Sequence, residues 1–167
     1  MIDVIEAGLH QSPRGRLDTS FSALVVCTGN ICRSPMAAAL LAQRLSRCGP
    51  GPRVESAGLA ALVGEPADPL AIALLGERNL DLTGHRARQL TPTLVSAFDL
   101  ILVMEQRQQR DVERILPVAR GRVHRVGRFG GFDVPDPYRK GRAAFEMSLA
   151  LIERGITEVA RAVWRVE

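Results

Sequence analysis

Two kinds of hydrophobic pattern alternate along this chain, and each predicts a different element of secondary structure. Apolar runs at residues 23–26 and 100–103 and mixed segments at 53–56 and 123–126 predict four short β-strands. Elsewhere apolar residues recur every three or four positions, which predicts helices. Because a connection between parallel strands needs a dozen or more residues, strands separated by helices indicate a parallel sheet. We therefore expect an α/β fold, a single three-layer domain whose four-stranded parallel sheet carries helices on both faces.

Start and stop signals place the ends of the expected helices. Ser34 is predicted to be the N-cap of the first helix, with a proline at the first helical position. Further helices are expected from Asp68 onward, over residues 105–116, and from about residue 141. Gly155 lies inside the last helix and is expected to cost about 1 kcal/mol relative to alanine. The apolar face of that helix is predicted to carry Phe145, Leu149, Ile152, Ile156, Val159 and Val163.

Length and composition fit one globular domain, because the 167 residues are 46% hydrophobic and 24% charged. No apolar run approaches the ~20 residues that span a bilayer, so no membrane insertion is expected. The first twenty residues mix charged with apolar positions and lack a secretion signal, which favours a cytoplasmic location. Residues 1–20 are expected to be an N-terminal tail, either disordered or artificial, ahead of a domain at residues 21–167.

Arginine supplies almost all of the positive charge, and Lys140 is the single lysine. With a formal net charge of +4, this composition favours an anionic partner that planar guanidinium groups can bind in a bidentate manner. Nucleic acid is not the expected partner, because the arginines are scattered among acidic residues and few aromatic residues are present for base stacking. The cysteines Cys27, Cys32 and Cys48 lack the paired spacing of a zinc site, and no Gly-Lys-Ser/Thr sequence indicates a nucleotide-binding loop. No metal and no cofactor is predicted.

The segment from Cys27 to Ser34 carries the strongest chemical signal. It joins a predicted buried strand directly to a helix N-terminus, so its backbone N–H groups can converge on an anion, which the helix dipole also favours. Gly29 and Asn30 tolerate the left-handed backbone angles that such a ring of N–H groups requires, and Arg33 can bind two phosphate oxygens. The predicted phosphate-binding residues are Thr28, Gly29, Asn30, Ile31, Cys32, Arg33 and Ser34.

Cys27 is the expected nucleophile of this loop. The helix N-terminus, the guanidinium of Arg33 and a hydrogen bond from Ser34 all favour its thiolate form. A thiolate beneath a bound phosphoryl group can displace the alcohol and form a phosphocysteine, which water then hydrolyses. A general acid must protonate the leaving oxygen. Asp136, between two prolines, is the candidate for this acid, and Asp133 is a nearby competitor.

Residues 25–35, Val-Val-Cys-Thr-Gly-Asn-Ile-Cys-Arg-Ser-Pro, resemble the active-site loop of the low-molecular-weight protein tyrosine phosphatases. Segments similar to that family follow in the family's order at residues 55–59, 84–90, 98–105 and 135–140. The resemblance implies that Cys27 is the nucleophile, that Arg33 clamps the phosphate and the transition state, and that Asp136 acts first as acid and then as base. It also implies that the substrate is a phosphotyrosine protein.

The resemblance extends to residues that support the loop and the pocket. It implies that Asn30 holds the shape of the loop through a hydrogen bond with His85, and that Ser34 tunes the thiolate. For Cys32 two interpretations remain, a core thiol or a redox partner that forms a disulfide with oxidised Cys27. The predicted substrate pocket is lined by Thr28, Ile31 and Tyr138.

In its middle part and at residues 135–140, the chain is most similar to a bacterial branch of the family. Members of this branch dephosphorylate autophosphorylating tyrosine kinases that control exopolysaccharide or capsule assembly. The expected protein partner is therefore a bacterial tyrosine kinase, and the expected small ligand is phosphate or another oxyanion. Arg139 lies where animal relatives carry a second tyrosine, so regulation through a tyrosine pair is not expected.

Three other functions are compatible with parts of the pattern. Protein arginine phosphatases share the fold, but relatives of that kind carry threonine at the position of Ile31, and an apolar side chain suits an aromatic ring better than a guanidinium. Arsenate reductases use two cysteines well downstream of the loop, whereas this chain has none after Cys48. A catalytically weak phosphotyrosine-binding module would not need both a nucleophile and an acid. The arginine phosphatase remains the main alternative.

Overall fold

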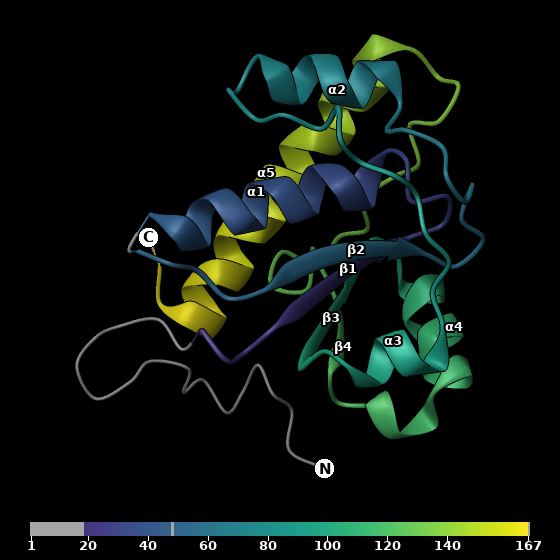
Figure 1. The fold of residues 1–167 in the computed structure, drawn as a ribbon, viewed down its shortest axis with the longest axis vertical. Helices are drawn as coiled ribbons and strands as arrows, with labels where there is room; N and C mark the ends of the chain where they lie inside the picture. Colours follow the sequence, from purple (N-terminus) through teal and green to yellow (C-terminus); the bar gives the residue numbers. More distant parts are fainter. Residues whose placement is uncertain (1–18, 48, 167) are drawn as a thin grey trace.

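The computed structural model describes residues 19–47 and 49–166. The predicted tail at residues 1–20 lies outside the described residues except for its last two, and Cys48 lies outside them as well. Within the described part, one sheet of four parallel strands has the order β2-β1-β3-β4 (Figure 1). The strands are β1 (Ala23–Cys27), β2 (Val54–Gly58), β3 (Leu100–Val103) and β4 (Val123–Arg125).

Helices cover both faces of this sheet, which confirms the predicted three-layer α/β domain (Figure 1). Alternate residues of each central strand enter different layers: Val25 packs with one hydrophobic cluster and Val26 with the other. The first layer consists of α1 (Arg33–Ser46), α2 (Pro69–Gly76) and α5 (Arg142–Trp164). The second consists of α3 (Pro92–Ser96), α4 (Gln106–Ile115) and the 3₁₀ helix η1 (Pro117–Ala119).

The N-cap predicted for the first helix was wrong. Helix α1 begins at Arg33 with Cys32 as its N-cap, and no side chain caps it. Ser34 lies inside the first turn, where its hydroxyl hydrogen-bonds within the loop that precedes the helix. Helix α3 was not predicted, because five residues are too few to show a helical period. Its start signals are nevertheless present, since Thr91 accepts a hydrogen bond from the Leu94 N–H and a proline follows Thr91.

Gly155 is required by the packing of α5 against the end of β4. A Cβ atom at this position would lie 2.6 Å from the carbonyl oxygen of Val126 and 2.5 Å from its Cγ1. The glycine lowers the helix propensity, as expected, but it allows a close approach of α5 to Val126 that a larger residue would prevent. The six apolar residues predicted for this helix face are all buried. None of the described helices is long and apolar enough to cross a membrane.

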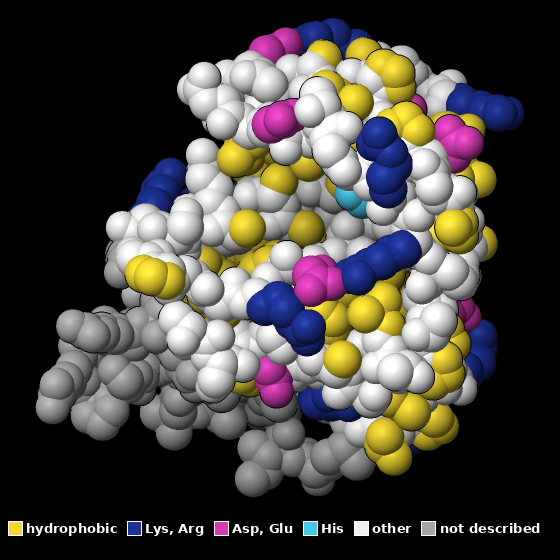
Figure 2. All heavy atoms as spheres, viewed as in Figure 1, with side chains coloured by type: hydrophobic (Ala, Val, Ile, Leu, Met, Phe, Trp, Pro, Cys, Tyr) yellow, Lys and Arg dark blue, Asp and Glu magenta, His cyan; other side chains and the backbone are white. Residues whose placement is uncertain are grey.

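Basic and acidic side chains are interspersed on the face that carries α1, α2 and β2 (Figure 2). Glu55 of β2 forms ion pairs with both Arg53 and Arg88. Arg142 at the start of α5 likewise pairs with Glu77 at 2.7 Å. The arginines that the sequence scatters among acidic residues are thus partly neutralised by those acids in the fold.

Candidate active site

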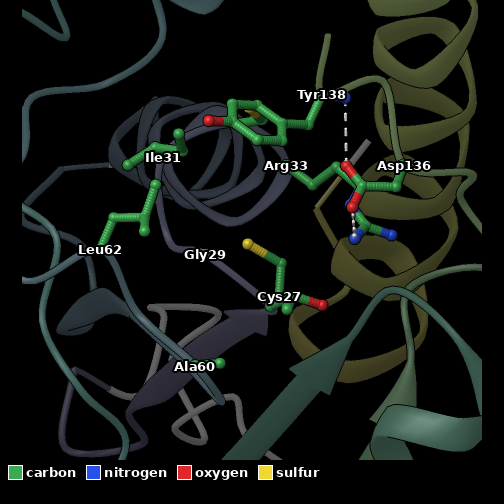
Figure 3. A pocket seen from close by; sticks show the side chains of 10 residues that line it. Cys27, Gly29, Ile31, Arg33, Ala60, Leu62, Asp136 and Tyr138 are labelled. Atoms are coloured by element: carbon green, nitrogen blue, oxygen red, sulfur yellow. Dashed lines mark hydrogen bonds and ion pairs between the residues drawn. The ribbon is translucent and has the colours of Figure 1, made fainter. Parts of the chain in front are cut away.

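A cavity of about 160 Å³ opens where β1 ends (Figure 3). The segment that follows β1 forms its floor, and its walls come from the loop after β2 and from the segment before α5. Eight residues predicted for the site line this cavity, namely Cys27, Thr28, Gly29, Ile31, Cys32, Arg33, Asp136 and Tyr138. Ala60 and Leu62 line it as well, and the sequence had not indicated them.

The backbone of the loop at residues 27–33 is oriented to bind an anion. The carbonyl oxygens of five consecutive residues, 27–31, accept hydrogen bonds from groups outside the loop. A planar trans peptide directs its N–H opposite to its carbonyl, so the N–H groups of residues 28–32 face the other side, where the cavity lies. These donors form a concave ring suited to phosphate oxygens. The groups that bind the carbonyls are the N–H of Leu59, Ala60, Leu62 and Asp68 and the ring Nε2 of His85, at 2.6–3.1 Å.

Asn30 fixes this loop from behind the cavity. It is fully buried and has a φ of 57°, the left-handed conformation predicted for it. Its side-chain Nδ2 donates to the hydroxyls of Ser34 and Ser56, both at 2.9 Å, and its Oδ1 accepts from the Arg88 N–H at 2.9 Å. Of the two residues expected to tolerate left-handed angles, Asn30 has a positive φ and Gly29 does not. One left-handed residue is enough to turn the loop.

Gly58, at the end of β2, lies directly behind the loop. A Cβ atom there would lie 2.5 Å from the carbonyl oxygen of Thr28 and 3.0 Å from Cβ of Asn30. A side chain at this position would therefore push the loop out of place. The sequence placed a glycine at the end of this strand, but the reason for it becomes visible only when β2 pairs with β1.

The sulfur of Cys27 lies on the floor of the cavity, and the side chain is 2% exposed. Its Sγ is 3.0 Å from the hydroxyl of Ser34 and 3.3 Å from the N–H of Asn30. The Ser34 oxygen accepts a hydrogen bond from the Asn30 amide, and its single hydrogen can point to the sulfur at 3.0 Å or to the Ala57 carbonyl, which is farther away at 3.5 Å. Both groups can thus donate to a sulfur anion at the N-terminus of α1.

Arg33 is almost fully buried, at 1% exposure, and three oxygen atoms of the protein hold its guanidinium in place. Its guanidinium donates to Glu105 at 2.6 Å and to the Val134 carbonyl at 3.0 Å, and it forms an ion pair with Asp136 at 3.1 Å. Burial raises the pKa of Glu105, but hydrogen bonds from Arg107 and Arg33 outweigh this effect, so the pKa is lowered overall. Glu105 is therefore a charged group that anchors the buried guanidinium.

The two candidate acids have different surroundings. Asp136 lines the cavity and its carboxylate is 40% exposed (Figure 3). Asp133 instead accepts hydrogen bonds from the N–H of Gln106, at the start of α4, and pairs with Arg125 at 2.8 Å. Only Asp136 is among the lining residues, so the arrangement favours Asp136 over Asp133 as a proton donor to a bound group.

The mouth of the cavity is apolar. Ile31, Leu62 and Tyr138 lie around it, above the sulfur (Figure 3). The guanidinium carbon of Arg139 is 5.1 Å from the centre of the Tyr138 ring, a contact that can hold this exposed ring in place. Walls of this kind accommodate a flat, apolar group above a bound anion.

Cys32 is the N-cap of α1 and is 4% exposed, although it contributes to the lining of the cavity. Burial raises the pKa of its thiol, and the nearby charge of Asp68 raises it further. The group is therefore a neutral thiol at physiological pH. No group of three or more His, Cys, Asp or Glu side chains within residues 19–47 and 49–166 is placed to hold a metal ion.

Sequence reasoning missed two residues at the start of α4 that contact the loop, its N-cap Glu105 and Gln108 in its first turn. Glu105 was taken as the start of a helix and Gln108 as part of its polar face. Glu105 binds Arg33, and the Gln108 side chain donates to the Thr28 hydroxyl at 3.1 Å. A signal was available for both, because they follow the buried strand β3, whose C-terminal end must lie beside that of β1 in a parallel sheet.

Comparison with known proteins places these features in one family. A model of the low molecular weight phosphotyrosine protein phosphatases matches residues 22–166. The probable low molecular weight protein-tyrosine-phosphatase EpsP of Ralstonia solanacearum is 52% identical over 133 residues, 80% of this chain and 89% of EpsP. Wzb of Vibrio vulnificus in complex with benzylphosphonate has a TM-score of 0.79 and 41% identity, covering 84% of this chain and 97% of Wzb. The YwlE arginine phosphatase of Geobacillus stearothermophilus has a TM-score of 0.77 and 30% identity, covering 84% and 91%.

Proposed function

Because the chain belongs to the low molecular weight phosphotyrosine protein phosphatases and is a protein-tyrosine phosphatase, we propose that it hydrolyses phosphotyrosine through a phosphocysteine intermediate. The observation that carries this proposal is the position of the Cys27 sulfur beneath a ring of backbone N–H groups, with Arg33 and Asp136 beside it. Each of the two chemical steps can be assigned to these three side chains.

In the first step the Cys27 thiolate attacks the phosphorus atom of a phosphate group bound in the loop. The phosphorus–oxygen bond to the tyrosine breaks as the sulfur–phosphorus bond forms, and Asp136 transfers its proton to the leaving oxygen. The loop N–H groups and Arg33 bind the other phosphoryl oxygens, whose charge rises in the transition state. The products are a phosphocysteine and a free tyrosine hydroxyl.

In the second step water attacks the phosphocysteine from the side that the tyrosine has left. The Asp136 carboxylate takes a proton from this water, and the sulfur–phosphorus bond breaks to return the thiolate and release inorganic phosphate. The ion pair between Arg33 and Asp136 supports this assignment of roles, because a phosphate bound beside Arg33 competes with that carboxylate. The negative charge of the phosphate then favours the protonated form of Asp136 that the first step needs.

The walls of the cavity support tyrosine rather than arginine as the phosphorylated residue. Ile31, Leu62 and Tyr138 offer apolar surface to an aromatic ring. A phosphoarginine side chain would place a polar guanidinium against the same apolar side chains, which offer its N–H groups few acceptors. The fold alone does not decide between them, because the YwlE arginine phosphatase shares it.

The physiological substrate is proposed to be an autophosphorylated bacterial tyrosine kinase, in the cytoplasm, in a pathway that makes exopolysaccharide or capsule. The similarity to EpsP over 89% of its length supports this assignment, together with the resemblance of residues 135–140 to the bacterial branch. A direct test compares hydrolysis of phosphorylated kinase tails with that of unrelated phosphotyrosine peptides.

The experiment that tests the chemistry measures hydrolysis of phosphotyrosine, phosphoserine and phosphoarginine peptides by the purified protein. Phosphotyrosine should be hydrolysed much faster than the other two. Cys27→Ser should abolish turnover and retain phosphate binding, and Asp136→Asn should slow turnover most for poor leaving groups. Asp133→Asn is the matched control, since this carboxylate contacts α4 rather than the cavity, and it should remain active.

Two results would contradict the proposal. Hydrolysis of phosphoarginine at an equal or higher rate would assign the protein to the arginine phosphatases instead. If Cys27→Ser turned over substrate at the rate of the unmodified protein, a phosphocysteine intermediate would be excluded. The intermediate can also be sought directly, by acid quenching within the first turnover and mass analysis of the peptide that contains Cys27.

A further inference from the structure

We propose that Gln108 is a positioning residue that makes the Thr28 hydroxyl a hydrogen-bond donor into the active-site cavity, where it binds an oxygen of the phosphoryl group. This inference rests on the proposed function, because it concerns the same phosphate site. It adds one side-chain donor to the ring of backbone N–H groups and assigns its orientation to a residue of α4.

The orientation of the Gln108 amide is determined by its buried partners. The side chain is 1% exposed, and its Oε1 lies 2.9 Å from the Met104 nitrogen and 3.1 Å from the Glu105 nitrogen. Backbone N–H groups can only donate, so the side-chain oxygen must face them. The Nε2 group of the amide must therefore point in the other direction, toward Thr28.

This arrangement determines the direction of the next hydrogen bond. Nε2 of Gln108 lies 3.1 Å from Oγ1 of Thr28. An amide NH₂ group has no lone pair to accept with, so Gln108 donates and Thr28 accepts. A hydroxyl carries a single hydrogen, and in this contact the hydrogen of Thr28 is not used. It is available to another acceptor.

The cavity is where that acceptor would be found. Thr28 follows the nucleophile Cys27 directly and is one of the residues that line the cavity. Across residues 19–47 and 49–166, Gln108 is the one hydrogen-bond partner recorded for the Thr28 hydroxyl. A phosphate monoester in the loop offers three non-bridging oxygens, which are strong acceptors.

The first turn of α4 prepares two donors at once. Glu105, the N-cap of α4, holds Arg33, and Gln108, three positions later, holds Thr28. Because protein groups hold both donors, little reorganisation is needed when charge develops on the phosphoryl oxygens. The preceding strand β3 places this turn beside the loop through its pairing with β1.

An isosteric substitution can reverse the hydrogen bond between these two side chains. In Gln108→Glu one carboxylate oxygen can still accept from the two backbone N–H groups. The second oxygen replaces Nε2 and is itself an acceptor, so the Thr28 hydroxyl must now donate to it and is lost to the phosphate. Thr28→Val removes the hydroxyl at nearly constant volume, and Thr28→Ser retains it.

The readout is the affinity for inorganic phosphate, measured by isothermal titration calorimetry, which does not require turnover. Thr28→Val should weaken binding by about tenfold, as expected for loss of a hydrogen bond to a charged acceptor. Thr28→Ser should stay within about twofold of the unmodified protein on the same scale. Gln108→Glu should weaken binding at least as much as Thr28→Val.

Gln108→Glu also adds a negative charge near the anion, which a control and a double variant can separate. Gln106→Glu adds the same charge at an exposed position of the same helix turn and should have a smaller effect. If Gln108 acts through the hydroxyl, Gln108→Glu should cost less affinity in the Thr28→Val background than in the unmodified protein. A purely structural role predicts the same cost in both backgrounds.

The inference is overturned if Thr28→Val binds phosphate as tightly as the unmodified protein, or if the Gln108→Glu effect is the same in both backgrounds. A protein that binds no phosphate overturns it too. Failure of the proposed function gives a different pattern, in which phosphate binds and the variants differ as described, but no phosphotyrosine peptide is hydrolysed.

Discussion

Replacing Glu105 tests how strongly its charge contributes to holding Arg33. The two groups are 2.6 Å apart, and their side chains are 17% and 1% exposed, so water cannot readily replace either partner. Breaking a buried ion pair costs about 3–5 kcal/mol of stability. Arg33 keeps the Val134 carbonyl and Asp136 as acceptors, so we expect the lower end of this range, about 3 kcal/mol, for Glu105→Ala.

Glutamine at position 105 removes the charge but keeps an oxygen that can accept from Arg33. We expect Glu105→Gln to lower the free energy of unfolding by about 1–2 kcal/mol, less than alanine does. The NH₂ group of the glutamine replaces the oxygen that pairs with Arg107, but Arg107 is exposed and can turn to solvent. Phosphatase activity should fall in the same order, because Arg33 becomes less firmly positioned for the phosphate.

Urea denaturation at several pH values measures how the free energy of unfolding of Glu105→Gln differs from that of the unmodified protein, and how this difference changes with pH. The pKa of Glu105 is lower in the folded protein than in the unfolded chain, because hydrogen bonds from two arginines outweigh the effect of burial. Its stabilising contribution is therefore complete above the unfolded value of about 4.3 and is lost as the pH falls through the folded value. The difference in the free energy of unfolding between the unmodified protein and Glu105→Gln should therefore be full at pH 7 and shrink as the pH falls below about 4.3.

The matched control is Glu77→Gln, which changes an ion pair of nearly the same length, 2.7 Å, between side chains that are about half exposed. Solvent screens such a pair, so the stability should change little. The reasoning fails if both variants lose the same stability, or if the loss in Glu105→Gln does not shrink at all as the pH is lowered below about 4.3.

Two further results are expected. Gly155→Ala should lower stability by about 1–2 kcal/mol, because overpacking against Val126 outweighs the gain in helix propensity. Gly76→Ala, where a Cβ would meet open space, should not; thermal denaturation distinguishes them. Iodoacetamide at pH 8 should modify Cys27 and leave Cys32 unmodified in peptide maps, since burial raises the pKa of the Cys32 thiol; preferential labelling of Cys32 would contradict this assignment.

The parts of the site that depend on local sequence were predictable. The run that ends at Cys27 had to be a buried strand, and a helix start follows it within a few residues. An anion-binding loop at this junction follows from the geometry of helix N-termini alone. The sequence nevertheless predicted Ser34 as the N-cap, whereas the N-cap is Cys32. Capping preferences assume that a side chain caps the helix, and here a loop of backbone N–H groups continues directly into it.

The contacts that hold the loop in place could not be predicted, because they join residues far apart in the chain. Arg33 and Glu105 are 72 positions apart, and Thr28 and Gln108 are 80 apart. Hydrophobic periodicity places each of these residues on an element or at its end but does not say which side chains meet. The same limit applies to Gly155, because the reason for a glycine there is visible only once Val126 is seen to pack against it.

The chemistry and the substrate preference of this site depend on different parts of the chain. In the proposed mechanism the phosphate is bound largely by the backbone of residues 27–33, and the carbonyls of residues 27–31 are held by hydrogen bonds from outside the loop. The proposed contacts of the substrate side chain are Ile31, Leu62 and Tyr138, which line the cavity, and the last two are 42% and 38% exposed. Exposed side chains can be exchanged at little cost in stability. A change of wall can therefore change the preferred phosphorylated residue without disturbing the ring, which explains how an arginine phosphatase shares this fold.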